Sequence, residues 1–233
     1  MKVIILIPTY NEADNIGLIL ERVFGVDQNF QVLVIDDDSP DGTARVAASK
    51  QEIFPNVSLL VRKENKGFAQ SYLDGFARVL NEKKHDAVVT MDADFSHDPK
   101  EIPAMLDMIQ GGADAVIGSR YARAKSFRHI PVWRRVLSRF ANAYVRFVLH
   151  LPVTDCTSGF IVMRRAVLEH LDLRGVRTEG YGFLFELKYR IAQAGFTIAE
   201  HAVEWPDRHL GASKMNFKRI FESARLPWLI RFG

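Results

Sequence analysis

Two aspartates separated by one residue, Asp92 and Asp94, form the motif whose chemistry is simplest to define. They follow a short apolar run, so both carboxylates are expected where a strand turns into a loop. Paired carboxylate oxygens are hard ligands that suit Mg²⁺ or Mn²⁺, and such an ion can bridge a diphosphate. An Asp-x-Asp pair also arises by chance in acidic loops, but its place directly after a buried run favours a metal site.

A second acidic group, three consecutive aspartates at positions 36–38, follows another apolar run. Aspartates at this place fit an ordinary turn. Three adjacent carboxylates repel one another, however, and a turn needs only one of them. We therefore expect Asp36 to accept hydrogen bonds from a nucleobase. Tyr10 is expected to pack against that base, and Glu12 either to cap a helix or to meet the ligand.

Basic residues are concentrated in the second half of the chain. The whole sequence carries 31 Lys and Arg against 28 Asp and Glu, yet residues 118–233 hold 20 basic and 9 acidic residues, and residues 1–117 hold 11 and 19. Residues 115–154 contain eight basic residues and no acidic one. This asymmetry indicates an anionic partner for the second half, with a solvated basic face as the alternative.

Composition excludes several classes of protein. A chain of 233 residues, 48% hydrophobic and 25% charged, suits one folded domain rather than a disordered segment. Its one cysteine cannot form an internal disulfide, which favours a reducing compartment. No apolar run approaches the roughly 18–20 residues that span a bilayer, and no signal-peptide pattern opens the chain. Glycine-rich phosphate cradles are absent from the sequence, so a bound diphosphate would need a metal or arginines. We expect no nucleic-acid partner.

The elements that position these groups follow from hydrophobic patterning. Strands buried on both faces are predicted at 3–7, 32–35, 57–61, 87–91 and 115–117, and helices after Glu12, over 67–80 and from 98 onward. Apolar strands that alternate with helices predict an α/β fold with a mostly parallel sheet flanked by helices. Ligands of such sheets bind at the carboxyl ends of the strands. The polar residues that follow each run are therefore expected to meet at one edge.

Several of these polar stretches together resemble a known family. They are Pro8 to Glu12, Asp36 to Thr43, Met91 to His97, Gly118 to Tyr121 and Asp155 to Phe160, followed by Asp207-Arg208 and Ser213-Lys214. In this order they are similar to the polyprenyl-phosphate (dolichyl-phosphate) mannose synthases, which are inverting family-2 glycosyltransferases of the GT-A fold. The resemblance implies one Rossmann-like GT-A domain over residues 1–214. It would comprise a nucleotide-sugar half at about 1–117 and an acceptor half at about 118–214, with an amphipathic segment at 215–233.

The resemblance also implies roles for individual residues. The nucleoside-binding positions match Pro8, Tyr10, Glu12, the backbone near Val34 and the Asp36 carboxylate. The motif for metal and diphosphate matches Asp92, Ala93 and Asp94. The basic residues that neutralise phosphates match Arg120, Arg134, Arg208 and Lys214. The acceptor phosphate is assigned to Arg120, Arg134 and Arg208, and catalysis to Asp94, Arg120 and Arg208. Some relatives carry Gln where this chain has Ser96, which leaves a third protein ligand of the metal open.

The implied reaction is the inverting transfer of mannose from GDP-mannose to a polyprenyl (dolichyl) monophosphate, with Mg²⁺ or Mn²⁺ as cofactor. Transfer of glucose or an amino sugar from a UDP-sugar to undecaprenyl phosphate is an alternative, because Tyr10, Asp36 and the metal carboxylates do not distinguish guanine from uracil. Two further alternatives belong to other classes. One is an Asp-x-Asp phosphatase with Asp92 as nucleophile and Asp94 as acid, and the other is an inactive nucleotide-sugar-binding module.

Two amphipathic segments suggest contact with a membrane. Within 131–151, helical spacing places Val132, Val136, Phe140, Ala143 and Phe147 on one face, edged by Arg135, Arg139 and Arg146. This pattern predicts an interfacial helix, and a core-packed helix with solvated arginines is the alternative. The C-terminal stretch 217–231 is a second candidate. We expect peripheral attachment on the cytoplasmic face of a membrane, either directly or through an anchoring subunit.

Overall fold

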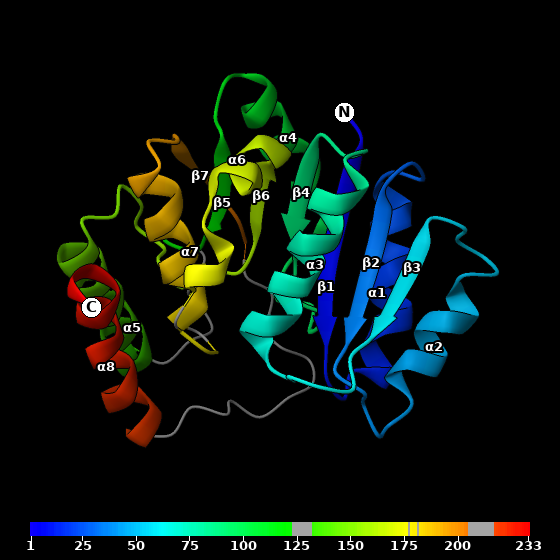
Figure 1. Cartoon of the computed structure of the whole chain (residues 1–233), viewed down its shortest axis with the longest axis horizontal. Helices are drawn as coiled ribbons and strands as arrows, with labels where there is room; N and C mark the ends of the chain where they lie inside the picture. Colours follow the sequence, from blue (N-terminus) through cyan, green and yellow to red (C-terminus); the bar gives the residue numbers. More distant parts are fainter. Residues whose placement is uncertain (123–131, 177, 181, 205–216) are drawn as a thin grey trace.

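The computed structural model describes residues 1–122, 132–176, 178–180, 182–204 and 217–233. Within these ranges, seven strands form one sheet in the order β3-β2-β1-β4-β6-β5-β7. The strands are β1 (Val3–Thr9), β2 (Gln31–Asp36), β3 (Val57–Val61), β4 (Ala87–Thr90), β5 (Ala115–Ser119), β6 (Ile161–Arg164) and β7 (Ile198–Ala202). Only β6 is antiparallel to its neighbours. The mostly parallel sheet predicted from the sequence is therefore confirmed (Figure 1).

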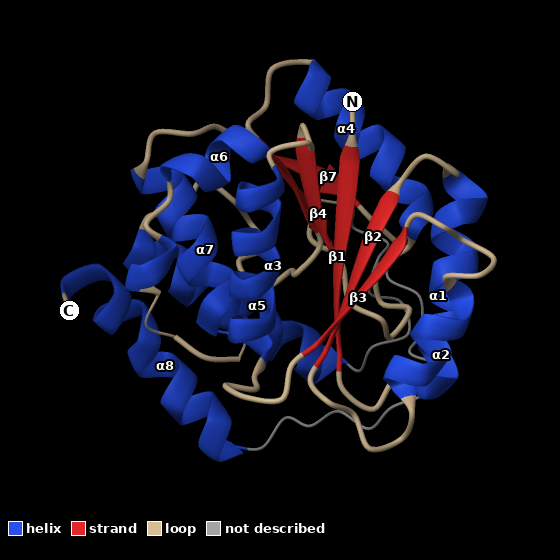
Figure 2. Ribbon diagram, turned by 45° about the vertical axis from the view of Figure 1, so that its right-hand side comes forward, coloured by secondary structure: helices blue, strands red, loops and turns tan. Residues whose placement is uncertain are grey.

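Helices cover both faces of this sheet (Figure 2). One core cluster packs α1 (Ala13–Val26), α2 (Thr43–Lys50), the short η1 (Pro99–Glu101) and α4 (Ile102–Gln110) against the sheet. The other packs α3 (Phe68–Glu82), α5 (Val132–Leu149), α6 (Arg165–His170) and α7 (Gly182–Gln193), near the short η2 (Leu173–Gly175). The last helix, α8 (Phe217–Phe232), contacts α5 and α7.

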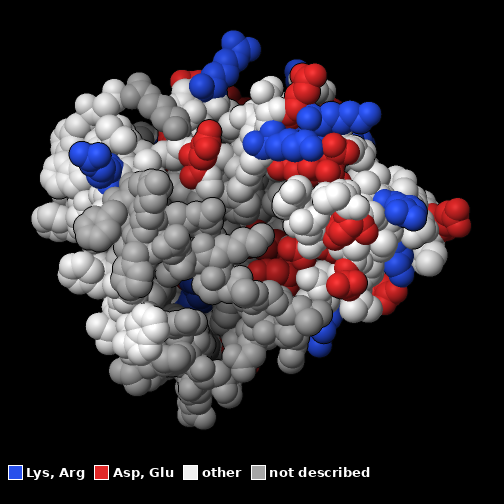
Figure 3. Space-filling view, turned by 90° about the horizontal axis from the view of Figure 1, so that it is seen from below, with Lys and Arg blue, Asp and Glu red and all other residues white. Residues whose placement is uncertain are grey.

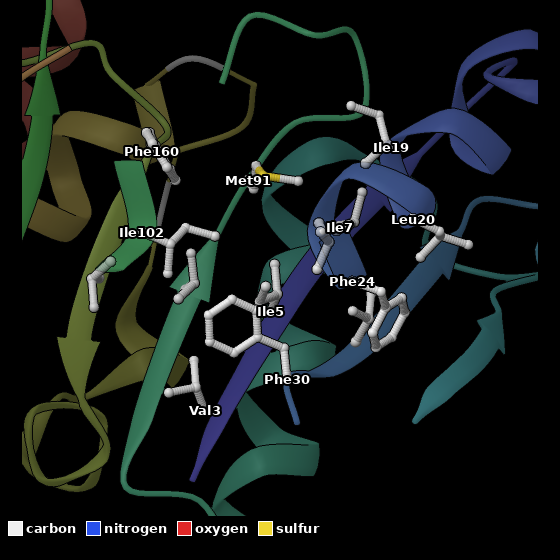
Figure 4. Packing of buried hydrophobic residues seen from close by; sticks show 14 of the residues in the cluster. Val3, Ile5, Ile7, Ile19, Leu20, Phe24, Phe30, Met91, Ile102 and Phe160 are labelled. Carbon is white, nitrogen blue, oxygen red and sulfur yellow. The ribbon is translucent and has the colours of Figure 1, made fainter. Parts of the chain in front are cut away.

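The inner strands are continuous apolar runs because both of their faces are covered. The prediction that residues 57–61 are buried on both faces is wrong, since β3 lies at the edge of the sheet and is only partly buried. In β1, Ile5 and Ile7 point into the first core cluster, while Ile4 and Leu6 point into the second. Figure 4 shows how Ile5 and Ile7 pack with Ile19 of α1 in the first cluster. From Val3 to Ile7 this alternation places an apolar side chain in a core at every position, as expected for a parallel sheet between two helical layers.

A glycine sets how closely α3 approaches the sheet. A Cβ atom added to Gly75 would lie 2.7 Å from Ile35 Cδ1 and 3.0 Å from Leu6 Cδ1. Any larger residue would push the helix away from β1 and β2. The N-terminal half of α3, which contains Tyr72, is thereby held close to the ends of these strands.

The carboxyl ends of the parallel strands meet at one edge. Register pairs Thr9 with Asp36 at the ends of β1 and β2, and Thr90 with Ile161 where β4 ends and the antiparallel β6 begins. The acidic loops and the segment before β6 therefore open on the same side of the sheet. Figure 3 views this side from below and shows acidic side chains gathered near its centre.

None of the helices in the described ranges combines the length and the apolar character that crossing a membrane requires.

Candidate active site

The loop after β4 carries the Asp-x-Asp pair at the carboxyl edge. The Asp92 side chain is 30% exposed. Asp94 accepts a hydrogen bond from the backbone N–H of Ser96 at 3.0 Å, and Phe95 between them has a left-handed φ of 63°. The Arg22 guanidinium lies over the Phe95 ring, 4.6 Å from its centroid. The tight loop thus folds back on itself with one carboxylate partly open to solvent.

Two side chains from other positions hold Asp92. The Tyr72 hydroxyl of α3 donates to Asp92 Oδ1 at 3.4 Å, and the Asp92 backbone N–H donates to His97 Nδ1 at 2.9 Å. Burial, followed by the negative charges of Asp92 and Asp94, raises the pKa of Tyr72 well above its ordinary value. That effect places both carboxylates near one hydroxyl group. His97 also stacks on Phe160 with ring centroids 5.0 Å apart, which helps to hold the loop in place.

The donor set of this loop fits a divalent cation. Asp92 and Asp94 supply hard carboxylate oxygens, and the Ser96 hydroxyl is buried with no hydrogen-bond partner in the described part of the chain. No group of three His, Cys, Asp or Glu side chains suited to a metal occurs among the described residues. A cation held by Asp92 and Asp94 would therefore complete its coordination with oxygens of the bound diphosphate or of water, as Mg²⁺ commonly does.

Asp36, the predicted base-binding residue, is wholly buried at the end of β2. Its Oδ1 accepts hydrogen bonds from Thr9 Oγ1 at 2.9 Å and Ser39 Oγ at 2.6 Å, and its Oδ2 accepts from the Ser39 backbone N–H at 2.8 Å. These bonds hold together the loops that follow β1 and β2. Contact between Asp36 and a nucleobase stays a prediction.

The next two aspartates also have partners within the protein. Asp37 forms a buried ion pair with Arg62 and accepts a hydrogen bond from the backbone N–H of Gly67 at 2.8 Å. Asp38 is half exposed and pairs with Lys66 at 2.9 Å, and this hydrogen bond lowers the pKa of Asp38. The repulsion expected among three adjacent carboxylates is thus relieved by cations from the segment that follows β3.

The other predicted nucleoside positions differ in their access to the edge. Tyr10 is 51% exposed in the loop after β1, and Pro8 is partly buried near the end of that strand. Glu12 precedes α1 but makes no side-chain cap bond; its Oε2 accepts from Asn15 Nδ2 at 2.7 Å. The Val34 side chain is completely buried, and β2 pairs with β1 and β3 on its two sides. Contact between the backbone near Val34 and a nucleoside stays a prediction.

Arg120, which follows β5, is held by the segment before β6. Its Nε and one terminal nitrogen donate to the two oxygens of Asp155, both at 2.7 Å, and the terminal nitrogen also donates to Thr157 Oγ1 at 2.6 Å. Asp155 has no exposed side-chain surface. Burial alone would raise the pKa of Asp155, but the hydrogen bonds and charge of Arg120 outweigh it and lower that pKa. The Arg120 side chain is 19% exposed.

The structure places some of the predicted site residues together, and their roles stay predictions. It brings Asp92, Ala93, Asp94 and Arg120 to the same edge, with Ala93 buried in the first core cluster. Arg208 and Lys214 lie outside the described residues, and so does the side chain of Arg134.

Sequence reasoning assigned no role to Tyr72 or to Lys188, although both contact this edge. A lysine among the many apolar residues of the stretch 183–191 is the signal that could have pointed to the second of these residues.

The fold and this edge together define a glycosyltransferase. The model of glycosyl transferase family 2 matches residues 4–172, which is more than half of the chain. The chain therefore belongs to glycosyl transferase family 2. This assignment confirms the predicted enzyme class and rejects the phosphatase alternative.

Three relatives match nearly the whole chain. It is 40% identical over 224 residues to the polyprenol monophosphomannose synthase of Mycolicibacterium smegmatis, covering 95% of this chain and 84% of the relative. It is 37% identical over 216 residues to the undecaprenyl-phosphate mannosyltransferase of Micrococcus luteus, covering 93% and 88%. It is 33% identical over 234 residues to the dolichol-phosphate mannosyltransferase of Pyrococcus furiosus, covering 97% of this chain and 62% of the relative.

Solved structures share the fold at low sequence identity. The mannosyl-3-phosphoglycerate synthase of Rubrobacter xylanophilus superposes with a TM-score of 0.70 at 17% identity, covering 99% of this chain and 72% of that one. The glucosyl-3-phosphoglycerate synthase of Mycobacterium tuberculosis, solved with Mn²⁺ and UDP, gives 0.68 at 18% identity, covering 99% and 78%. The predicted GT-A fold is therefore confirmed.

Proposed function

We propose that the protein transfers mannose, with inversion, from GDP-mannose to a polyprenyl monophosphate. The observation that carries this proposal is the meeting of the Asp92–Asp94 loop and the Arg120–Asp155 pair at one edge of a family-2 fold. Relatives named for polyprenyl-phosphate mannose synthesis, 33–40% identical to the chain, support the choice of sugar and acceptor.

The reaction needs charge neutralisation more than a general base. An oxygen of the acceptor monophosphate, already an anion near neutral pH, forms the new bond to the anomeric carbon, while the bond from that carbon to the GDP oxygen breaks. Direct displacement from the opposite face inverts the configuration. Asp92 and Asp94 would hold Mg²⁺ or Mn²⁺, which neutralises the charge that develops on the departing diphosphate. Arg120 is aimed at the same edge by Asp155 and supplies a second positive charge.

A transfer assay tests donor and acceptor together. The protein is incubated with Mg²⁺ and a polyprenyl phosphate and with either labelled GDP-mannose or labelled UDP-glucose. We expect the label to enter the organic phase from GDP-mannose and to depend on both metal and lipid phosphate. Label entering only from UDP-glucose would overturn the mannose assignment in favour of the UDP-sugar alternative. GDP binding with no turnover on any lipid phosphate would favour the inactive binding module.

The second part of the proposal concerns the membrane. The stripe of α5 predicted to be apolar is exposed: Val136 by 61%, Phe140 by 72% and Phe147 by 77%. The helix packs on the protein through a different stripe that includes Asn142, Val145 and Leu149. This exposure favours an interfacial helix over a core-packed one, because an amphipathic helix lying in a membrane surface buries such a stripe in lipid.

Helix α8 lies beside α5 and extends this surface (Figure 1). The Trp228 indole N–H donates to the Tyr144 hydroxyl at 2.8 Å, which ties the two helices together. Trp228 is 51% exposed and Phe232 is 67% exposed. We propose that Val136, Phe140, Phe147, Trp228, Leu229 and Phe232, named here the aromatic surface, contact the cytoplasmic face of a membrane.

Vesicle flotation tests the aromatic surface. Wild type should float with vesicles that contain anionic lipid, and the double variant Phe140→Glu/Phe147→Glu should remain in the soluble fraction. Ile53→Glu is the matched control, because Ile53 is 63% exposed but lies after α2, far along the chain from both helices. Equal flotation of all three proteins would contradict the proposal. Absence of flotation in all three would favour an anchoring subunit instead.

A further inference from the structure

Lys188 on α7 is a cation enclosed in the protein. Its side chain is completely buried, and its ammonium group donates to the carbonyl oxygens of Ser158 at 2.6 Å, Cys156 at 3.1 Å and Leu184 at 3.2 Å. An ammonium group has three N–H donors, so these three bonds use all of them. Burial lowers the pKa of Lys188 to about 8, although the nearby charge of Asp155 opposes this effect.

Two of the three carbonyls belong to the segment Asp155 to Phe160, which leads into β6. The third belongs to the preceding turn of α7 itself. The hydrogen bonds of Lys188 therefore hold the Asp155 to Phe160 segment against α7. Burying an ammonium group whose hydrogen bonds all go to neutral carbonyls is costly, and an apolar side chain would avoid that cost. The arrangement calls for a reason beyond packing.

The fastened segment touches both charged parts of the site. Asp155 and Thr157 receive the Arg120 guanidinium. In the same segment, Gly159 faces the Asp92–Asp94 loop, because a Cβ atom added to Gly159 would lie 3.7 Å from Asp92 Oδ1. Thr90, at the end of β4, also donates to the Gly159 carbonyl at 2.6 Å. The position of this segment thus fixes Arg120 relative to Asp92.

We propose that Lys188 is a positioning residue for the transfer reaction, because it holds the Asp155 to Phe160 segment that aims Arg120 toward the diphosphate. This inference rests on the function proposed above and names a residue that acts in it without touching either substrate.

The test compares two variants that each remove a cation bonded to carbonyl groups. Lys188→Met keeps the length and removes the charge. Arg164→Met is the control, because Arg164 donates to the carbonyls of Ala113 and Ile109 at the opposite edge of the sheet. We expect Lys188→Met to lower kcat by about 10–100-fold and to change the Kd for GDP with Mn²⁺ less than about threefold, since small misplacements of a positioned group have effects of this size. Arg164→Met should keep its kcat. A folded Lys188→Met with wild-type kcat, or an equal loss in both variants, would overturn the proposal.

A double-mutant cycle shows whether the effect passes through Arg120. In an Arg120→Lys background, Lys188→Met should add less than about a threefold loss, because the group that it positions is already compromised. An undiminished further loss would mean that Lys188 acts elsewhere and would overturn the proposal. If Lys188→Met does not fold, Lys188→Gln, which keeps an amide donor, takes its place in both experiments.

Hydrogen exchange separates this proposal from the proposed function. The amides of residues 156–160 should exchange at least about tenfold faster in Lys188→Met than in wild type, and the Arg164→Met control should leave them unchanged. This readout needs no turnover. Absence of transfer by the wild-type enzyme would defeat the proposed function and leave the exchange result to decide on Lys188. Unchanged exchange would overturn the positioning role even in an active enzyme.

Discussion

Two acidic loops lie at the same edge of the sheet, and they use their carboxylates differently. In the loop after β2, Asp36 and Asp37 are bound by hydroxyl groups, backbone N–H groups and Arg62. In the loop after β4, the Asp92 side chain stays 30% exposed, and Tyr72 contacts it at the long distance of 3.4 Å. The two buried aspartates of the first loop thus hold the protein together, and the half-exposed Asp38 pairs with Lys66, whereas Asp92 in the second loop keeps part of its side chain exposed to solvent. The partners of the carboxylates, more than the number of aspartates, distinguish the two loops.

The largest effect is expected from the second loop. Asp94→Asn should lower metal-dependent turnover by about a thousandfold or more, because loss of the cation removes several kcal/mol of transition-state stabilisation. Thermal unfolding should confirm that the fold is intact. Asp38→Asn in the first loop is the matched control and should keep its turnover, since Asp38 is half exposed and pairs with Lys66 at the surface. Undiminished activity in Asp94→Asn would remove the metal role.

The first loop should respond in stability instead. Asp37→Asn should lower the free energy of unfolding by about 2–3 kcal/mol, since it leaves the buried Arg62 guanidinium without its buried partner. Denaturant titration measures this loss. Asp74→Asn removes the more exposed partner of the same guanidinium, with a side chain that is 43% exposed, and should cost less than about 1 kcal/mol. Equal losses of unfolding free energy in Asp37→Asn and Asp74→Asn would show that burial of the Arg62–Asp37 pair does not contribute to stability.

Tyr72 offers a finer test of the second loop. Tyr72→Phe keeps the ring that stacks 5.7 Å from Phe183 and removes only the hydroxyl that reaches Asp92. We expect about tenfold weaker Mn²⁺ affinity in the presence of GDP, because groups that orient a metal ligand have effects of this order. Titration calorimetry gives the value. The control Phe76→Leu alters the same aromatic stack without touching a carboxylate, and it should leave the metal affinity unchanged.

A further effect concerns pH and the Lys188 ammonium group, which is buried behind the segment that holds Arg120. The pKa of Lys188 is about 8 in the folded protein, against about 10.4 in an unfolded chain. Between these values the unfolded chain holds a proton that the folded chain lacks, so raising the pH through this window favours the folded state. The free energy of unfolding should therefore rise with pH across this window. In Lys188→Met that part of the pH dependence should vanish, and a curve parallel to that of wild type would contradict the assignment.

Much of the architecture follows from local sequence. The five predicted strands occur at the expected places, because each is a continuous apolar run between polar loops. The strands β6 and β7 were not predicted: β6 is only four residues long, and β7 carries Glu200 and His201 in a partly buried strand. The apolar run of β6 is short, and charged or polar residues interrupt that of β7.

The candidate site could be predicted where its reactive side chains directly follow a strand, as Asp92 and Asp94 do. It was not predictable where partners come from distant positions. Asp155 meets Arg120 across 35 residues, and Tyr72 meets Asp92 across 20 residues. The burial of Asp36 could not be deduced either, because its partners Thr9 and Ser39 are ordinary turn residues until the strand register brings them together.

Binding of Mn²⁺ tests the difference between the two loops most directly. Electron paramagnetic resonance of free Mn²⁺, titrated with protein in the presence of GDP, measures the bound ion without any turnover. We expect Asp92→Asn and Asp94→Asn to abolish binding, while Asp37→Asn and Asp38→Asn, once shown to be folded, bind as wild type does. Wild-type binding in the first pair of variants, or its loss in the second pair, would contradict the assignment of the cation to the loop after β4.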